Sequence, residues 1–329
     1  MLLSKIPKIE LHLHLDCSLS YPAASQLSAG LSQSEYDEKF PLPEKCKGLA
    51  DFLSRVPNIL NLLQTEAGLR MAVNDLFHQL KADNVIYAEI RFAPLLHLEE
   101  GLAAEEVVEI VTDAFDKAEQ ETGITAGIIL CTLRHFTEAQ GMQTIKLVEK
   151  YRDKSVVALD LAADEAGFPL DAHKAAFRYA MAHDIPRIAH AGEAKGPESV
   201  WETLNALQPS RIGHGVRSIE DPMLMEYLRN HGIHLEICPT CNVQIDVFAS
   251  YETHPIDRLY KAGISVGINT DGRTLPQVTL TQEYEKLKNT FGWENSDFLN
   301  CNMNALRAAF LPENKRKSLL SQLQQATAS

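Results

Sequence analysis

The sequence predicts a single domain over 1–329, folded as a (β/α)8 TIM barrel with a helical insertion after the first strand. Eight short apolar runs alternate with longer segments of helical periodicity, a pattern typical of a parallel sheet connected by helices. Nearly every run ends in a polar or ionisable residue, as strands do where such a barrel gathers its reactive groups. A length of 329 residues suits one barrel with insertions.

The ends of the expected strands indicate where the chemistry lies. The strands are expected at 8–16, 85–94, 126–135, 156–165, 185–193, 211–216, 234–242 and 265–273. They end in LHLD, EIRF, LRH, ADE, HAGE, GHG, CPTCN and NTDGR. A barrel that served only as a scaffold would have no reason to place ionisable groups at so many strand ends, so these ends form the expected active site.

The first expected strand, KIELHLHLD, carries an unusual polar face. Side chains at i and i+2 point to the same side of a strand, so His12, His14 and Asp16 share one face. Strands five, six and eight bring further polar side chains to the same mouth. The candidate metal ligands or proton carriers are therefore His12, His14, His190, His214 and Asp271. Nitrogen and oxygen donors of these kinds suit Zn²⁺, with iron or cobalt as substitutes.

A long segment separates the first two expected strands and exceeds an ordinary barrel connection. Its apolar residues in LADFLSRVPNILNLLQ follow a helical spacing that Pro57 should kink or divide. We expect a helical insertion at about 20–80, on the catalytic face. Two interpretations stay open, an apolar lid over the site and ordinary core packing.

The charge balance argues against two classes of partner. The chain has 44 acidic and 31 basic residues, and its net charge of -13 would repel nucleic acid or an anionic membrane. A neutral or cationic small substrate fits better. The first residues resemble no signal peptide, and no run approaches the roughly 18 apolar residues of a spanning helix. We expect a cytoplasmic protein, and the sequence does not indicate its oligomeric state.

The six cysteines are expected to be buried thiols rather than a disulfide framework. The CPTC spacing is also found in redox motifs and zinc knuckles, but no second CxxC follows, and the motif falls on an expected inner strand. Cytidine deaminases combine HxE with PCxxC. Here Pro239 follows Cys238 instead of preceding it, which argues against that kind of site.

Taken in order, eight motifs resemble those of the adenosine deaminases, a family of the amidohydrolase superfamily, in their bacterial form. They are ELHLHLD, YAEIRFAP, LRH, DLAADE, HAGE, RIGHG, CPTCN and NTDGRT. The resemblance covers roughly 8–284, and the motifs are specific together although an isolated HxH would be weak.

The resemblance implies one zinc ion per chain, with a water molecule as a further ligand. The implied ligands are His12, His14, His190 and Asp271, while His214 stays outside the coordination sphere. His14 is also expected to face the substrate. Many relatives hold two metals bridged by a carbamylated lysine of the fourth strand, but VVALDLAADE contains no lysine. This absence favours a single metal.

Deamination at C6 of adenine requires an activated water and a proton for the ring. Zinc lowers the pKa of its bound water from about 15.7 toward about 7. His214 is the candidate to orient that water and accept its proton, together with Asp271. Glu193, three residues after His190, is the candidate general acid that protonates N1 of the purine.

Three positions carry the implied substrate contacts besides His14, namely Asp16, Ala163 and Gly272, and Cys17 is a further departure from the family pattern. Ala163 replaces the family's glycine, whose N–H reaches N3, and the contact survives if φ stays negative. Asp16 aligns with the ribose-hydroxyl contact and would repel a 5′-phosphate. Cys17 replaces a glycine. Gly272 replaces the second aspartate of NTDD-type motifs, so water is expected at N7 rather than Arg273.

The sequence therefore predicts a zinc-dependent hydrolytic deaminase of a 6-aminopurine nucleoside. Adenosine and 2′-deoxyadenosine are the first candidates, and adenine, N6-substituted adenines and aminodeoxyfutalosine are the alternatives. Another hydrolase of the superfamily, acting on a lactone, amide or phosphoester, is a second enzyme class. A metal-binding module without activity is the alternative outside enzymes. Metal content separates them, because binuclear hydrolases hold two ions.

Overall fold

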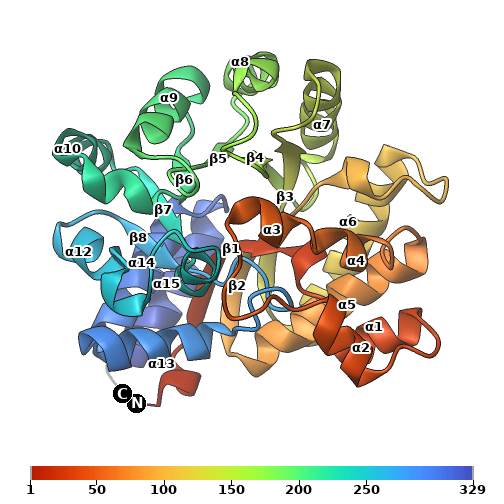
Figure 1. The fold of residues 1–329 in the computed structure, drawn as a ribbon, viewed down its shortest axis with the longest axis horizontal. Coiled ribbons are helices and arrows are strands. Elements are labelled where there is room, and N and C mark those ends of the chain that lie inside the picture. Colours follow the sequence, from red (N-terminus) through yellow and green to blue (C-terminus); the bar gives the residue numbers. More distant parts are fainter. Residues whose placement is uncertain (1, 328–329) are drawn as a thin grey trace.

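The computed structural model describes residues 2–327 and shows the expected barrel (Figure 1). Eight parallel strands are hydrogen-bonded in chain order. They are β1 (Lys8–His14), β2 (Val85–Phe92), β3 (Thr125–Leu133), β4 (Val156–Ala162), β5 (Arg187–Ala191), β6 (Arg211–His214), β7 (His234–Ile237) and β8 (Val266–Ile268). All eight predicted strands are present, although each ends before the predicted residue.

Helices surround the strands (Figure 1). Between consecutive strands lie α1 (Tyr21–Leu27), α2 (Gln33–Lys39), α3 (Leu49–Leu53), α4 (Val56–Leu60), α5 (Glu66–Ala82), α6 (Ala104–Thr122), α7 (Glu138–Tyr151), α8 (Lys174–Ala182), α9 (Pro197–Leu207), α10 (Pro222–His231), α11 (Pro239–Gln244) and α12 (Ile256–Lys261). After β8 follow α13 (Leu280–Phe291), α14 (Asn295–Ala308) and α15 (Glu313–Thr327). Within residues 2–327, no helix is both long and apolar enough to span a bilayer.

The segment between β1 and β2 forms the expected helical insertion, which comprises α1 to α5. Its apolar stretch is divided as predicted, because α3 ends at Leu53 and Pro57 lies in the first turn of α4. Proline fits there, since the first N–H groups of a helix have no partner within the helix.

The barrel closes between β1 and the chain that follows β8. The side-chain oxygen of Asn269 accepts hydrogen bonds from the N–H groups of Leu11 and His12, at 2.8 and 3.0 Å. Farther along, His14 donates from its backbone to Asp271 at 2.7 Å, and Asp271 donates to His12 at 3.1 Å. This pairing carries Asp271 to the end of β1, although β8 itself ends at Ile268.

The prediction that CPTC lies on an inner strand is wrong. β7 ends at Ile237, and Pro239 begins the short helix α11. Proline has no N–H for the sheet, and its fixed φ suits the first turn of a helix. Consistent with the expected packing role, all six cysteines are free and buried.

Buried charges fill the barrel interior beneath its mouth. Arg91 of β2 forms ion pairs with Asp160 of β4 at 2.7 Å and with Glu236 of β7 at 2.6 Å. Arg211 of β6 reaches Glu236 at 2.7 Å and also pairs with Glu89. Charges at such depth are tolerated only when they are paired and hydrogen-bonded. The network therefore forms a rigid polar floor under the residues at the strand ends.

Candidate active site

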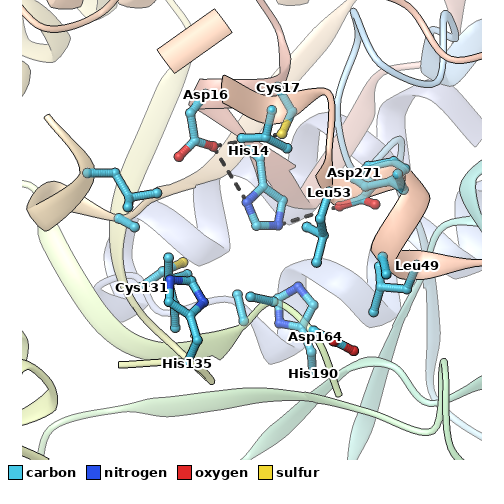
Figure 2. Close-up of a pocket in the computed structure, with 18 of the residues that line it drawn as sticks. His14, Asp16, Cys17, Leu49, Leu53, Cys131, His135, Asp164, His190 and Asp271 are labelled. Atoms are coloured by element: carbon cyan, nitrogen blue, oxygen red, sulfur yellow. Dashed lines mark hydrogen bonds and ion pairs between the residues drawn. The ribbon is translucent and has the colours of Figure 1, made fainter. Parts of the chain in front are cut away.

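A cavity of about 670 Å³ lies at the carboxyl ends of the strands (Figure 2). Its polar wall comes from the barrel and contains His14, Asp16, His190, Glu193, His214 and Asp271. Its apolar wall comes from the insertion and contains Leu49, Phe52, Leu53, Val56, Pro57 and Leu60. In Figure 2, Leu53 of α3 lies beside the ring of His14, and Leu49 lies farther along the same side of the cavity. The insertion thus contributes one wall of the candidate site.

The predicted ligands meet at one end of this cavity. Nε2 of His12 lies 3.3 Å from Oδ1 of Asp271, and Nε2 of His14 lies 3.5 Å from the same oxygen. The ring of His190 is 4.5 Å from that of His12, between centroids. Two sets of three side chains have ligand atoms within 4.8 Å of one another: His12, His14 and His190, and His12, His214 and Asp271.

The partners of the outer ring nitrogens orient two imidazoles toward the cluster. Nδ1 of His12 contacts Glu236 at 3.0 Å, and Nδ1 of His190 contacts Asp160 and the carbonyl of Leu161 at 3.3 and 3.1 Å. Such outer contacts commonly set the direction of metal-binding histidines. Sequence analysis missed Glu236, Asp160 and their shared partner Arg91. In the sequence, each of them stands out only as a charged residue within an apolar strand.

The residues fit a divalent metal ion by three criteria. Nε2 of His12 is fully buried and has no hydrogen-bond partner in the described chain, which is costly unless something else binds it. Burial, aided by the charge of Arg91, lowers the pKa of His12 and His14 and favours the neutral imidazole that binds metals. Three imidazoles and one carboxylate form a donor set that zinc commonly takes.

Glu193 and His214 lie together beside this cluster. Oε1 of Glu193 is 3.4 Å from Nε2 of His214. The side-chain nitrogen of Asn242, on α11, contacts Glu193 at 3.5 Å and Nδ1 of His214 at 3.2 Å. Sequence analysis missed Asn242 because its motif was taken for a strand.

Their environments push the pKa values of this pair apart. Burial, then the charges of Asp271 and Glu165, raises the pKa of Glu193 well above its usual value. Burial, then neighbouring His190, lowers the pKa of His214. A protonated carboxyl beside a neutral imidazole is the arrangement of a proton donor and a proton acceptor.

Asp16 lies on the side of His14 away from Asp271 (Figure 2). Its Oδ1 is 3.8 Å from Nδ1 of His14, and burial raises its pKa to about 6. As the sequence predicted for a substrate contact, both side chains line the cavity.

Three predicted site residues have backbone conformations that are unusual outside glycine. The φ angles are 76° for Ala163, 60° for His214 and 68° for Asp271. Strained backbone of this kind occurs preferentially at functional sites, where the surrounding structure holds it. Ala163 lines the cavity as expected, but its φ is positive rather than negative. The chain turns sharply where it leaves β4, and a β-carbon at this position raises the energy of the turn.

Ala163→Gly should therefore stabilise the fold by about 0.5–1 kcal/mol. Glycine relieves roughly 1–2 kcal/mol of left-handed strain, and its greater freedom in the unfolded chain offsets only part of this gain. The free energy of unfolding in urea measures the effect. Ala162→Gly is the matched control, since Ala162 lies inside β4 and is buried. It should destabilise the protein, and equal losses in both variants would contradict the strain at Ala163.

Gly272 leaves no room for a side chain. A β-carbon there would lie 2.7 Å from both Cβ and the carbonyl oxygen of Cys17. Cys17, not Gly272, lines the cavity. Arg273 points elsewhere and pairs with Glu10 at 2.8 Å and Asp83 at 3.1 Å. Arg273 therefore does not line the cavity, and the thiol of Cys17 lies at this part of the wall.

Comparisons with known proteins agree with the motifs. The family model described as adenosine deaminase matches residues 7–326. A protein of Clostridium perfringens named adenosine deaminase is 34% identical over 97% of this chain and 98% of its own.

Two solved structures share the fold. An amidohydrolase from Burkholderia ambifaria with bound Zn is 21% identical and has a TM-score of 0.88, covering 99% of this chain and 93% of that one. Arabidopsis ADAL complexed with IMP is 22% identical and has a TM-score of 0.89, covering 99% and 98%. Since the family model spans nearly the whole chain and the Clostridium relative aligns over its full length, this chain belongs to the adenosine deaminase family and is a hydrolytic deaminase.

Proposed function

We propose that the chain is a zinc-dependent deaminase that converts adenosine and 2′-deoxyadenosine to inosine and 2′-deoxyinosine, with release of ammonia. The observation that carries the proposal is the meeting, at one end of a mostly apolar cavity, of the histidine and aspartate cluster with Glu193 and His214. Such a site combines metal ligands with a separate proton donor and proton acceptor.

His12, His14, His190 and Asp271 would hold one zinc ion. The donor set and the unpartnered Nε2 of His12 support this assignment. When bound, zinc supplies the Lewis acidity that makes water a nucleophile near neutral pH.

Glu193 and His214 divide the proton transfers. Glu193, protonated because its carboxyl is buried, donates a proton to N1 of the purine and makes C6 electrophilic. His214, neutral in its buried position, accepts a proton from the attacking water. Water adds at C6 and the amino group leaves as ammonia, so the overall reaction consumes one water per nucleoside.

The remaining lining positions the nucleoside. Asp16 accepts a hydrogen bond from a ribose hydroxyl. The N3 contact of Ala163 is expected only for a negative φ, so at its φ of 76° Ala163 is assigned to the pocket wall alone. His14 and Cys17 complete this side of the pocket, and Gly272 lies against Cys17 outside the lining. We assign α3 and α4 as a lid, because their apolar side chains form one wall of the cavity and exclude water. We also propose that the chain is a single-domain enzyme of the cytoplasm.

The lining also supports a nucleoside rather than a nucleotide as substrate. Within residues 2–327, no Lys or Arg lines the cavity, and Asp16 would repel a phosphate. We expect kcat/KM for AMP to be at least about 100-fold lower than for adenosine, because a phosphate would lose its hydration without gaining a cation.

A panel assay by ultraviolet absorbance tests this assignment. The panel contains adenosine, 2′-deoxyadenosine, adenine, N6-methyladenosine, aminodeoxyfutalosine and AMP. The highest kcat/KM with either nucleoside supports the proposal. Preference for AMP would overturn the nucleoside assignment, and the highest value for another compound would identify the alternative substrate.

The missing side chain at Gly272 gives a prediction for N7 of the purine. With Arg273 paired elsewhere and no side chain at Gly272, we expect water or the weakly donating Cys17 thiol at N7. Replacing N7 by carbon, in 7-deazaadenosine, should lower kcat/KM by no more than about tenfold, or roughly 1.4 kcal/mol. Steady-state kinetics of the two nucleosides measures the ratio, and a drop of about 10³ would reveal a strong donor at N7.

A further inference from the structure

We propose that Glu165 is the positioning residue that holds the general acid Glu193 in place by binding the backbone of its loop. This inference rests on the role proposed for Glu193. Glu165 follows β4, at the end of the DLAADE motif, and its side chain is buried. The loop that carries Glu193 connects β5 to α9.

The carboxylate of Glu165 accepts five hydrogen bonds, four from this loop and one from Ser199 in the first turn of α9. Oε2 accepts from the backbone N–H groups of Glu193, Ala194 and Lys195 at 3.0, 2.7 and 2.9 Å. Oε1 accepts from the N–H of Gly192 at 2.7 Å and from the hydroxyl of Ser199 at 2.5 Å. Four consecutive N–H groups therefore converge on a single side chain, which lies about thirty residues earlier in the sequence.

This convergence requires an anion. Consecutive N–H groups that curl around one point form a concave site that favours negative charge. The curl depends on Gly192, whose φ is 68° and where a β-carbon would lie 2.5 Å from Val200. Without this acceptor, four N–H groups, two of them buried and two partly buried, would lose their partner, which is unfavourable. The loop thus keeps its shape because Glu165 fills it.

The shape of the loop decides where the Glu193 side chain points. Glu165 binds the N–H of Glu193 itself and those of both neighbours, so the backbone at Glu193 is fixed from one side. From there the Glu193 carboxyl reaches His214 and Asn242 at 3.4 and 3.5 Å. A displacement of about 1 Å at a reacting group can cost about 10²-fold in rate. Glu165 acts through Glu193 and needs no contact with the substrate.

Glu165→Gln tests the proposal in the zinc-loaded enzyme with adenosine. The amide keeps the size of the side chain but turns one acceptor into a donor that faces N–H groups. We expect kcat to fall about 10- to 100-fold, with KM changed less than about threefold and zinc content unchanged. Glu198→Gln is the matched control, because Glu198 is exposed and accepts from only the N–H of Gly196 in the same loop. Its kcat should stay within about twofold of the wild type.

A double mutant separates positioning from general damage to the fold. If Glu165 acts through Glu193, the variant with both Glu165→Gln and Glu193→Gln should be no slower than Glu193→Gln alone. Multiplying losses, or an unchanged kcat in Glu165→Gln, would overturn the inference. If Glu165→Gln does not fold, Ser199→Ala takes its place. It removes one of the five hydrogen bonds and should lower kcat about 3- to 10-fold, and an unchanged kcat would contradict positioning.

These experiments distinguish a failure of the proposed function from a failure of the inference about Glu165. If the wild-type enzyme deaminates adenosine and Glu193→Gln is impaired, the role of Glu193 stands whatever Glu165→Gln shows. A wild-type enzyme without activity on the substrate panel would instead refute the proposed function itself.

Discussion

Replacing Glu193 by glutamine is expected to lower kcat for adenosine by at least about 100-fold, the scale of a lost general acid. The amide has nearly the same shape and can keep the contacts with His214 and Asn242, but it cannot give a proton to N1. KM should change little, because the variant can still bind the purine edge.

Zinc analysis and steady-state kinetics on the same preparation check this result. Glu198→Gln again serves as the control, since that carboxylate is exposed in the first turn of α9, next to the same loop. Near-normal turnover in a zinc-replete Glu193→Gln enzyme would show that the proton comes from elsewhere.

Removing any proposed ligand should release the metal and abolish turnover. Substitution of His12, His14, His190 or Asp271 by alanine takes away one donor of the cluster. The affinity for zinc should fall by more than the roughly 10- to 100-fold that follows the loss of an outer hydrogen-bond partner. Zinc content after dialysis against a weak chelator measures the loss.

His214→Ala is the informative comparison. In the wild type the ring of His214 lies 4.7 Å from that of His12, between centroids, and His214 shares a possible ligand set with His12 and Asp271. If it only accepts a proton, the alanine variant keeps its zinc and loses activity. Loss of zinc from His214→Ala, or full zinc occupancy in any of the four ligand variants, would require another coordination sphere.

Much of the fold could be predicted because the eight strands are short and strongly apolar. The runs at β1 to β4 show this best, since their predicted starts differ from the observed starts by at most one residue. The predicted ends extend too far because polar residues at the mouth continue the same spacing after sheet pairing has stopped. At β8 the side chain of Asn269 takes the N–H groups of β1, so the strand stops at Ile268.

The motifs also led to the residues of the candidate site, which the structure places close together, although Gly272 does not line the cavity. The sequence showed which side chains end strands, and barrel closure carries those ends to one cavity. It could not show that Ala163 adopts a positive φ, because a single alanine carries no signal for it. Only the close approach of residues 17 and 272 explains why a glycine follows Asp271.

The supporting residues were harder to predict. Glu236 and Asp160 interrupt apolar strands, and only the three-dimensional structure reveals that they meet Arg91 beneath two histidines. Glu165 was visible in a motif, but its partners are backbone N–H groups of another loop. Nearly every residue carries a backbone N–H group, so the sequence does not show which of them a side chain will bind.

Zinc titration of the metal-free protein tests the central claim most directly. Bound zinc per chain and the rate of adenosine deamination are measured on the same samples. A mononuclear deaminase predicts no turnover without metal, a rate that rises in proportion to bound zinc, and a plateau at one ion per chain. A plateau reached only at two ions, or full activity in the metal-free protein, would contradict the account.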